Sequence, residues 1–225
     1  VPNNSARDLV RVNSDAVGLV VRGVSNPFYA DIIKAIEREI DAAGYTMVMQ
    51  QIGIAEDEIA RGAMMEREKK LRGLIFLGGR SDCAPEDMGT ITVPFVCCSF
   101  TNSFGTLSKS EYSSVSIEDF ETARRAVREL HRLGHRRIAA LVSETDDRSI
   151  SELRYHGYTT ALREFGLEPE PELVACAGSF GMHDAYAATQ RLLDSGAEVT
   201  AIFAISDMMA IAAIKALEDR GRRVP

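Results

Sequence analysis

The sequence predicts an α/β protein built from two doubly wound, Rossmann-like lobes with parallel sheets. Short β-branched runs alternate with long amphipathic segments from Ala16 onward, which is typical of parallel strands joined by crossover helices. The alternation forms two successive series, separated by a polar loop near residues 100–113. With 225 residues and 45% hydrophobic content, the chain can bury a sizeable core. We therefore expect an N-terminal lobe over residues 14–116 and a C-terminal lobe over residues 117–225.

The first series begins with a strand over residues 16–21, which is apolar on both faces as a buried parallel strand should be. The helix that follows repeats apolar residues at spacings of 4, 3 and 4 from Tyr29 to Ile40, and Gly44 stands at the expected left-handed stop. The other expected elements of this series are strands over 45–49, 73–77, 93–98 and near 114–116, and a charged helix over 56–70.

The second series begins with a helix whose apolar face runs from Phe120 to Leu130 and which stops at Gly134. Its strands are expected over 138–142, 173–176 and 201–205, and its helices over 150–165, 183–194 and 208–219. In doubly wound folds, ligands sit beyond the carboxyl ends of the strands. The loops after the strands of two such lobes would face each other across a cleft.

Composition narrows the class of protein. A charged fraction of 26% and a net charge of −7 describe an ordinary acidic protein, whereas a free-standing nucleic-acid binder would show a basic excess. The longest apolar runs are strand-sized, and the polar segment over residues 1–7 carries no export signal. The four cysteines lack a CxxC pair and are expected to be free thiols. We therefore expect a cytoplasmic protein.

Signatures of common enzyme classes are missing. The sequence contains no GxGxxG after the first strand, no GxxxxGK[ST], no GxSxG and no HExxH. The best metal candidate is His131 with His135, but Gly134 breaks the helix between them and no third ligand is evident nearby. We expect no catalytic activity, no cofactor and no metal.

Aromatic and charged side chains gather where the predicted strands end. This combination suits a small polar ring, because aromatic faces can stack on the ring while arginine and aspartate bond its edge. The candidate effector-binding residues are Phe28, Tyr29, Ser99, Phe100, Arg148, Arg154, Phe180 and Asp207.

Each candidate also has a structural alternative. Phe28 and Tyr29 could be core contacts of the first turn of a helix. Phe100 and Phe180, which lie in predicted loops, could contact the other lobe. Arg154 could be a surface helix residue, and Asp207 could cap a helix that starts at Met208.

The first twenty residues contain two short motifs, PNNSARDL over residues 2–9 and VGLV over residues 17–20. They resemble the hinge and first strand of LacI/GalR-family repressors, whose pattern is PNxxARxL, a spacer and then IGL. Further matches follow in the family's order: NPFY at 26–29, LGHRRI at 133–138, Arg154 with Gly157-Tyr158, and SDMMA at 206–210.

The resemblance implies a periplasmic-binding-protein type I fold and a homodimer that binds operator DNA. It implies that residues 1–13 are a hinge-helix remnant and linker, preceded in the gene by a helix-turn-helix domain. Leu9 would be wedged into the minor groove, an insertion that kinks a duplex. The hinge residues implied to contact DNA are Asn4, Ala6, Arg7 and Leu9. Seven of the eight candidates above, all except Ser99, match positions that line the family's effector cleft, with Arg154 and Asp207 the most dependable.

The sequence departs from the family pattern at two places that affect which effector it can bind. Many members of the family place Asp where Ser99 stands and Asp-Asn where Ile117-Glu118 stand, so part of the polar edge that grips sugar hydroxyls is missing. A sugar, a sugar derivative or a flatter, nucleobase-like ring therefore all remain open. The family also continues beyond Val224-Pro225, so we expect the C-terminal lobe to be incomplete.

The sequence thus predicts the ligand-sensing and dimerisation core of a transcriptional regulator, most simply a repressor, whose effector alters operator binding allosterically. A solute-binding protein of a sugar importer is the main alternative, because it shares the fold and the cleft. A second alternative is an α/β enzyme that acts on a small phosphorylated or glycosidic substrate.

Overall fold

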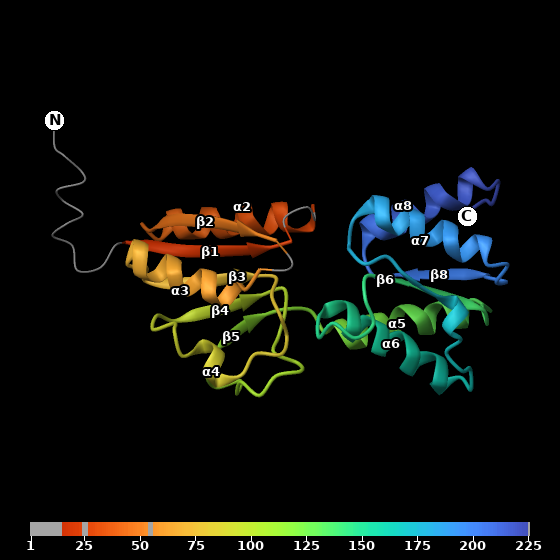
Figure 1. Cartoon of the computed structure of the whole chain (residues 1–225), viewed down its shortest axis with the longest axis horizontal. Helices are drawn as coiled ribbons and strands as arrows, with labels where there is room; N and C mark the ends of the chain where they lie inside the picture. The colour runs from red at the N-terminus through yellow and green to blue at the C-terminus, as the bar shows by residue number, and fades with distance from the viewer. Residues whose placement is uncertain (1–14, 24–26, 54–55, 225) are drawn as a thin grey trace. The chain divides into compact units, whose positions relative to one another are not determined.

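Strands and helices alternate along the chain in a computed structural model that describes residues 15–23, 27–53 and 56–224. The elements divide into two units, residues 1–116 and 117–225, called here the N-terminal and C-terminal units. Each unit contains one sheet, and every strand pairing in both sheets is parallel (Figure 1). The predicted α/β class with two Rossmann-like lobes is confirmed.

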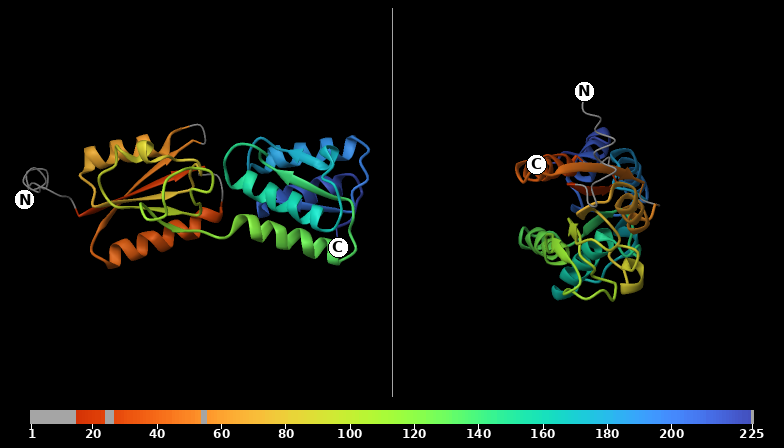
Figure 2. Two further views of the ribbon diagram at one scale, coloured as in Figure 1. Left: turned by 90° about the horizontal axis from the view of Figure 1, so that it is seen from below. Right: turned by 90° about the vertical axis from the view of Figure 1, so that its left-hand side faces the viewer.

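The N-terminal unit is a five-stranded sheet in the order β2-β1-β3-β4-β5. Its strands are β1 (Ala16–Arg22), β2 (Thr46–Ile52), β3 (Gly73–Leu77), β4 (Phe95–Cys98) and β5 (Ser113–Val115). Its helices are α2 (Phe28–Ala42), α3 (Glu58–Lys69) and the short α4 (Pro85–Met88). The left view of Figure 2 shows α2 and α3 on opposite faces of the sheet, as a doubly wound fold requires.

Apolar strands form the core of this unit because helices cover both faces of the sheet. Leu19 and Val21 of β1 are fully buried, and β3 contributes Leu77 to the same cluster. Asp57 caps α3 by accepting hydrogen bonds from two backbone N–H groups, and Lys70 ends the helix in the left-handed conformation. The ends of the strands and of α3 therefore determine where the connecting loops of this unit begin.

The C-terminal unit has the sheet order β7-β6-β8. Its elements are α5 (Asp119–Arg132), β6 (Ile138–Val142), α6 (Ile150–Glu164), the 3-10 helix η1 (Pro171–Leu173), β7 (Val174–Cys176), α7 (Met182–Asp194), β8 (Ala201–Ala204) and α8 (Asp207–Asp219). All five residues of the central strand β6 are buried. Figure 1 shows α5 and α6 on one face of this sheet and α7 and α8 on the other.

Gly157 and Tyr158 set the packing of α6. A Cβ atom on Gly157 would lie 2.3 Å from the Phe120 carbonyl oxygen and 2.9 Å from the Ala123 Cβ, so only glycine allows α5 to approach this closely. Tyr158 is fully buried, and its hydroxyl donates a hydrogen bond of 2.8 Å to the carbonyl oxygen of Ile138 in β6. The two residues bind α6 to a helix on one side and to the sheet on the other.

A few elements differ from the sequence prediction. The short α4 and η1 were not expected, because four and three residues give too few turns for a periodic pattern. The strand expected over 93–98 begins at Phe95, since Pro94 has no N–H to donate and contributes only its carbonyl to Leu74. The second strand runs to Ile52, three residues further than expected.

No helix in the described part of the chain is long and apolar enough to cross a membrane. The predicted hinge, with Asn4, Ala6, Arg7 and Leu9, lies outside the described residues.

Candidate functional site

The carboxyl edge of the sheet in the C-terminal unit gathers four of the predicted residues. Because β6, β7 and β8 are parallel, the loops that follow them leave from the same edge. Arg148 lies in the loop after β6, Phe180 in the loop after β7, and Asp207 begins α8 two residues after Ile205. Arg154 reaches this edge from the second turn of α6.

Three contacts fix the guanidinium of Arg154. Its Nε donates to Asp119 Oδ1 over 2.8 Å, and its Nη2 lies 2.7 Å from the same oxygen. Its Nη1 donates to the carbonyl oxygen of Ile205, at the end of β8. The side chains of Arg154 and Asp119 are 20% and 5% exposed. These contacts use three of the five N–H groups of a guanidinium, so the group is held in place and can still donate to a ligand.

Asp119 is a functional candidate that the sequence did not suggest. Burial raises the pKa of its carboxyl above 3.8, although the charge and hydrogen bond of Arg154 act in the opposite direction. The partners lie 35 residues apart in the chain, so no local spacing connects them. The available signal was an acidic residue in the first turn of a helix, a position that the helix dipole favours for many reasons.

Asp207 does not cap its helix. The cap of α8 is Ser206, whose hydroxyl accepts a hydrogen bond of 3.3 Å from the Met209 backbone N–H. Asp207 is the first residue of α8 and is exposed. Its carboxylate follows Ile205, the residue that Arg154 contacts, by two positions. The guanidinium of Arg154 thus reaches the residue at the end of β8 that Asp207 follows by two positions.

Arg148 sits in a loop that α6 holds rigidly. Its backbone N–H donates to Glu152 Oε2 over 2.7 Å, and the hydroxyl of Ser151 bonds both the N–H and the carbonyl oxygen of Glu144. Arg148 has a positive φ of 54°, and Ser99 in the N-terminal unit has a φ of 67°. A left-handed backbone at a residue other than glycine costs about 1–3 kcal/mol and tends to occur at functional sites.

Phe180 is half-buried in the loop between β7 and α7, where it packs against the core of the C-terminal unit. Its ring is therefore anchored, and part of it stays exposed at the edge where the other three residues lie.

The N-terminal unit holds the other four predicted residues at the carboxyl edge of its own sheet. Tyr29 and Phe100 are buried, at 8% and 3% exposure, whereas Phe28 is 57% exposed. A Cβ atom at Gly78 would lie 2.6 Å from the Tyr29 hydroxyl, and one at Gly79 would lie 2.5 Å from the Phe100 ring. Both buried rings rest on the backbone that follows β3.

Ser99 follows β4 directly, and its N–H donates to the Val115 carbonyl oxygen over 2.8 Å. The loop after it is held by Asn102, whose side chain exchanges hydrogen bonds of 2.7 and 2.8 Å with the backbone of Cys83. Among the three aromatic candidates of this unit, Phe28 is the one whose side chain is largely exposed.

A buried carboxylate that the sequence did not single out ties this edge together. Glu58 is fully buried at the start of α3 and accepts a hydrogen bond of 2.7 Å from the Arg80 N–H. Its Oε2 lies 3.6 Å from Nε of Arg22, the last residue of β1. Glu58 thus joins the ends of β1 and β3 and stabilises the loops that surround the candidate residues.

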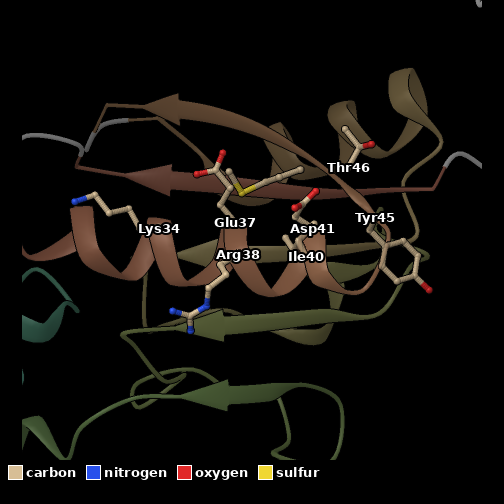
Figure 3. Close-up of a pocket in the computed structure, with 8 residues that line it drawn as sticks. Lys34, Glu37, Arg38, Ile40, Asp41, Tyr45 and Thr46 are labelled. Carbon is tan, nitrogen blue, oxygen red and sulfur yellow. The ribbon is translucent and has the colours of Figure 1, made fainter.

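A hollow of about 590 Å³ lies elsewhere on the N-terminal unit, between α2 and β2 (Figure 3). Its lining consists of four charged residues, one aromatic, two apolar and one uncharged polar residue: Lys34, Glu37, Arg38, Ile40, Asp41, Tyr45, Thr46 and Met47. None of the eight candidate residues contributes to it.

Among the described residues, no group of three or more His, Cys, Asp or Glu side chains is placed to hold a metal ion. His131 stacks on Phe165 with ring centroids 3.7 Å apart, and Gly134 has the left-handed φ of 98° that ends α5 before His135. His131 therefore packs the last turn of α5 against the end of α6, and His135 lies beyond the helix.

Comparison with known proteins identifies the family. Residues 14–225 match the family model described as periplasmic binding proteins and sugar binding domain of LacI family. The chain is 38% identical, over its whole length, to the HTH-type transcriptional regulator MalR of Clostridium butyricum, and 32% identical to the HTH-type transcriptional regulator CelR of Thermobifida fusca. It spans 67% and 66% of these two proteins.

The structure of a complex between the transcriptional regulator CelR and cellobiose is similar along 99% of this chain and 69% of that one, with a TM-score of 0.79 and 29% identity. The predicted family resemblance is thus confirmed by sequence and by fold. The chain belongs to the family of periplasmic binding proteins and LacI-type sugar-binding domains, and within it to the transcriptional regulators.

Proposed function

We propose that this chain is the effector-sensing core of a DNA-binding transcriptional regulator, which binds a small sugar-like ligand and thereby changes its affinity for an operator. Arg154 and Asp207, which both lie near the end of β8, carry the proposal. Arg154 is fixed by a buried carboxylate and the Ile205 carbonyl, and Asp207 is exposed two residues after Ile205 and does not cap α8. Such a pair can donate to one side of a polar ring and accept from the other.

Each unit also offers further candidate ligand contacts of its own. Phe180 in the C-terminal unit and Phe28 in the N-terminal unit offer partly exposed aromatic faces, which suit the apolar faces of a pyranose ring. Arg148 and Ser99 hold strained backbone conformations at strand ends, which is typical of ligand-contacting positions. Because the rings of Tyr29 and Phe100 are buried, we expect them to shape the surface of the N-terminal unit that the ligand contacts.

The ligand is expected to be a sugar or sugar derivative, up to the size of a disaccharide. The similar regulator CelR has been solved with cellobiose bound. Ser99 has a shorter polar side chain than the aspartate common in the family, so a ligand with fewer hydroxyl groups on that side is favoured.

Regulation is proposed to be reciprocal. If ligand binding weakens operator binding, the operator complex must bind the ligand more weakly by the same factor. Asn4, Ala6, Arg7 and Leu9 are proposed to contact the operator, together with a preceding helix-turn-helix domain, in a homodimer. Such a regulator works in the cytoplasm, where the DNA is, and needs no catalytic activity of its own.

The relatives support a regulator over the solute-binding protein of an importer, since the similar curated proteins are HTH-type transcriptional regulators and repressors. They support a binding function over an enzymatic one for the same reason.

A thermal-shift screen of the full-length protein against sugars, sugar phosphates, polyols and nucleobases tests the ligand site. A ligand at about 100 times its Kd stabilises the folded state by about 2.7 kcal/mol, which raises Tm by roughly 5 °C. We expect Arg154→Ala and Asp207→Asn each to abolish this shift. Glu172→Gln, which removes an exposed carboxylate in η1, is the matched control and should leave the shift intact. A shift that survives both site substitutions contradicts the proposed site.

A further inference from the structure

A basic patch lies at the amino edge of the sheet in the N-terminal unit, the edge opposite the candidate residues. Its members are four exposed cations at the end of α3 and just beyond it: Arg67, Lys69, Lys70 and Arg72. Glu68 is the one carboxylate within these six residues, so four positive charges and one negative charge leave +3. The whole chain has a net charge of −7, so the patch runs against the overall charge.

The patch adjoins the point where the chain enters the N-terminal unit. The N–H of Arg72 donates a hydrogen bond of 2.8 Å to the carbonyl oxygen of Ala16, the first residue of β1, and Leu71 is buried between the cations. Figure 1 shows α3 ending at the edge of the sheet where β1 begins. Leu9 of the proposed hinge precedes Ala16 by seven residues, which span at most about 25 Å when fully extended. A duplex that Leu9 contacts would therefore come within about 25 Å of Ala16 at this edge.

Helix stability accounts for only part of the patch. Cations in the last turn of a helix interact favourably with its dipole, which covers Arg67 and Lys69. Arg72 lies beyond the helix. Within the described part of the chain, neither Arg67 nor Arg72 forms an ion pair, whereas Arg61 in the same helix is paired with Glu56 at 2.9 Å. Ion pairs among the described residues therefore do not account for the exposed guanidinium groups of Arg67 and Arg72.

We propose that the basic patch binds backbone phosphates of the operator duplex next to the hinge. This inference rests on the proposed function, because it requires a DNA-binding regulator. Phosphate contacts carry no sequence information, but they add affinity through counterion release and fix the orientation of a protein on the duplex. The patch would let the core, and not only the DNA-binding domain, contribute to operator affinity.

Salt dependence of operator binding by the full-length protein tests the proposal. The triple variant Arg67→Gln, Lys69→Gln, Arg72→Gln removes three charges and leaves the left-handed Lys70 unchanged. Its matched control is Arg125→Gln, Arg163→Gln, Arg222→Gln, which removes three exposed cations of the C-terminal unit. Affinity is measured between 50 and 200 mM salt on a duplex with an operator selected in vitro, once with flanks of ten base pairs and once without.

Each phosphate contact adds about 0.9 to the slope of log affinity against log salt, so a fourfold rise in salt weakens affinity by about 3.5-fold per contact. We expect the patch variant to lower this slope by about 2–3 on the flanked duplex, to lose less on the short duplex, and to keep the wild-type response to the sugar ligand. Equal slopes for the patch and control variants would overturn this inference and leave the proposed function standing. Failure of the wild-type protein to bind any duplex would overturn both.

Discussion

Arg154 is the residue on which the candidate site depends most, because its position is determined by groups from two other elements. Asp119 holds it from the start of α5, and the Ile205 carbonyl holds it from the end of β8. Any ligand that contacts Arg154 therefore acts on both elements. Asp119 serves as a positioning residue, since its 5% exposed side chain is occupied by Arg154.

The substitution Asp119→Asn should show how much Asp119 contributes to ligand affinity, by orienting Arg154, and how much it contributes to the free energy of unfolding. We expect a loss of about 1–2 kcal/mol in unfolding free energy, below the roughly 3–5 kcal/mol for breaking a fully buried pair, because Arg154 is one-fifth exposed and burial already penalises the ionised carboxylate. Ligand affinity should fall about tenfold, as the charge-assisted hydrogen bond that orients the guanidinium is lost.

Isothermal titration and denaturant unfolding measure the two effects of Asp119→Asn. Asp194→Asn, which breaks an exposed pair with Arg220, is the control and should change neither quantity much. Unchanged ligand affinity in Asp119→Asn would remove Asp119 from the site.

The cysteines give a second prediction at this scale. Burial raises the pKa of Cys83 to about 11 and that of Cys97 to about 12, while Cys176, the last residue of β7, is exposed. Since thiolates are the reactive form, a disulfide reagent at pH 8 should modify Cys176 first and reach Cys83 and Cys97 only on unfolding. Cys176→Ser should remove the fast phase of the reaction. A fast phase that persists in this variant would contradict the assignment.

Sequence reasoning found the positions of the candidate residues but not their environments. It placed Tyr29 and Phe100 after strands, yet their burial depends on Gly78 and Gly79, which let the rings lie against the backbone. It missed Asp119 because the pairing with Arg154 forms only when α5 and α6 are packed. Contacts between distant segments leave no local pattern.

At the scale of elements, long and strongly periodic segments were predictable. The helices α2, α5, α6, α7 and α8 lie within a few residues of their expected bounds, because each has several turns with a regular apolar face and most end at a glycine. The short α4 and η1 have no such face. The LGHRRI segment matched the family, and the structure gives its physical role: Gly134 ends α5, and Arg137 bonds the Glu198 carbonyl oxygen and the Glu170 carboxylate.

The contact between α5 and α6 is the element-scale feature most open to test. Gly157→Ala would place a methyl group 2.3 Å from the Phe120 carbonyl oxygen, and backbone cannot yield as a flexible side chain does. We expect a loss of about 1–3 kcal/mol in unfolding free energy and, because α6 carries Arg154, a weaker ligand response.

Gly89→Ala is the control for this substitution. Gly89 has a φ of −61°, and its nearest neighbour to a new Cβ is 3.4 Å away, so the change should stay within about 0.5 kcal/mol. Equal unfolding free energies for Gly157→Ala and the wild type, from urea titrations, would show that α5 and α6 can separate without cost.

At the scale of the whole molecule, the proposed function requires a sugar-binding core that is joined to a DNA-binding domain through the segment before Ala16. The fold class was accessible from the alternation of strands and helices, whereas the regulatory role was accessible only through the PNNSARDL motif and the order of the other family motifs. The identity of the ligand could not be predicted from the sequence. It depends on side chains from many loops, and no rule of residue spacing describes how these loops lie together.

The most direct test measures operator affinity of the full-length protein with and without the ligand from the screen, by fluorescence anisotropy at fixed salt. We expect a change of about 5- to 150-fold, the usual range of allosteric coupling, and we expect Asp207→Asn to remove the change while keeping operator affinity in the absence of ligand. A ligand that binds the protein with the same affinity in the presence and absence of operator, and leaves operator binding unaltered, would contradict the claim that this chain is a sensing core.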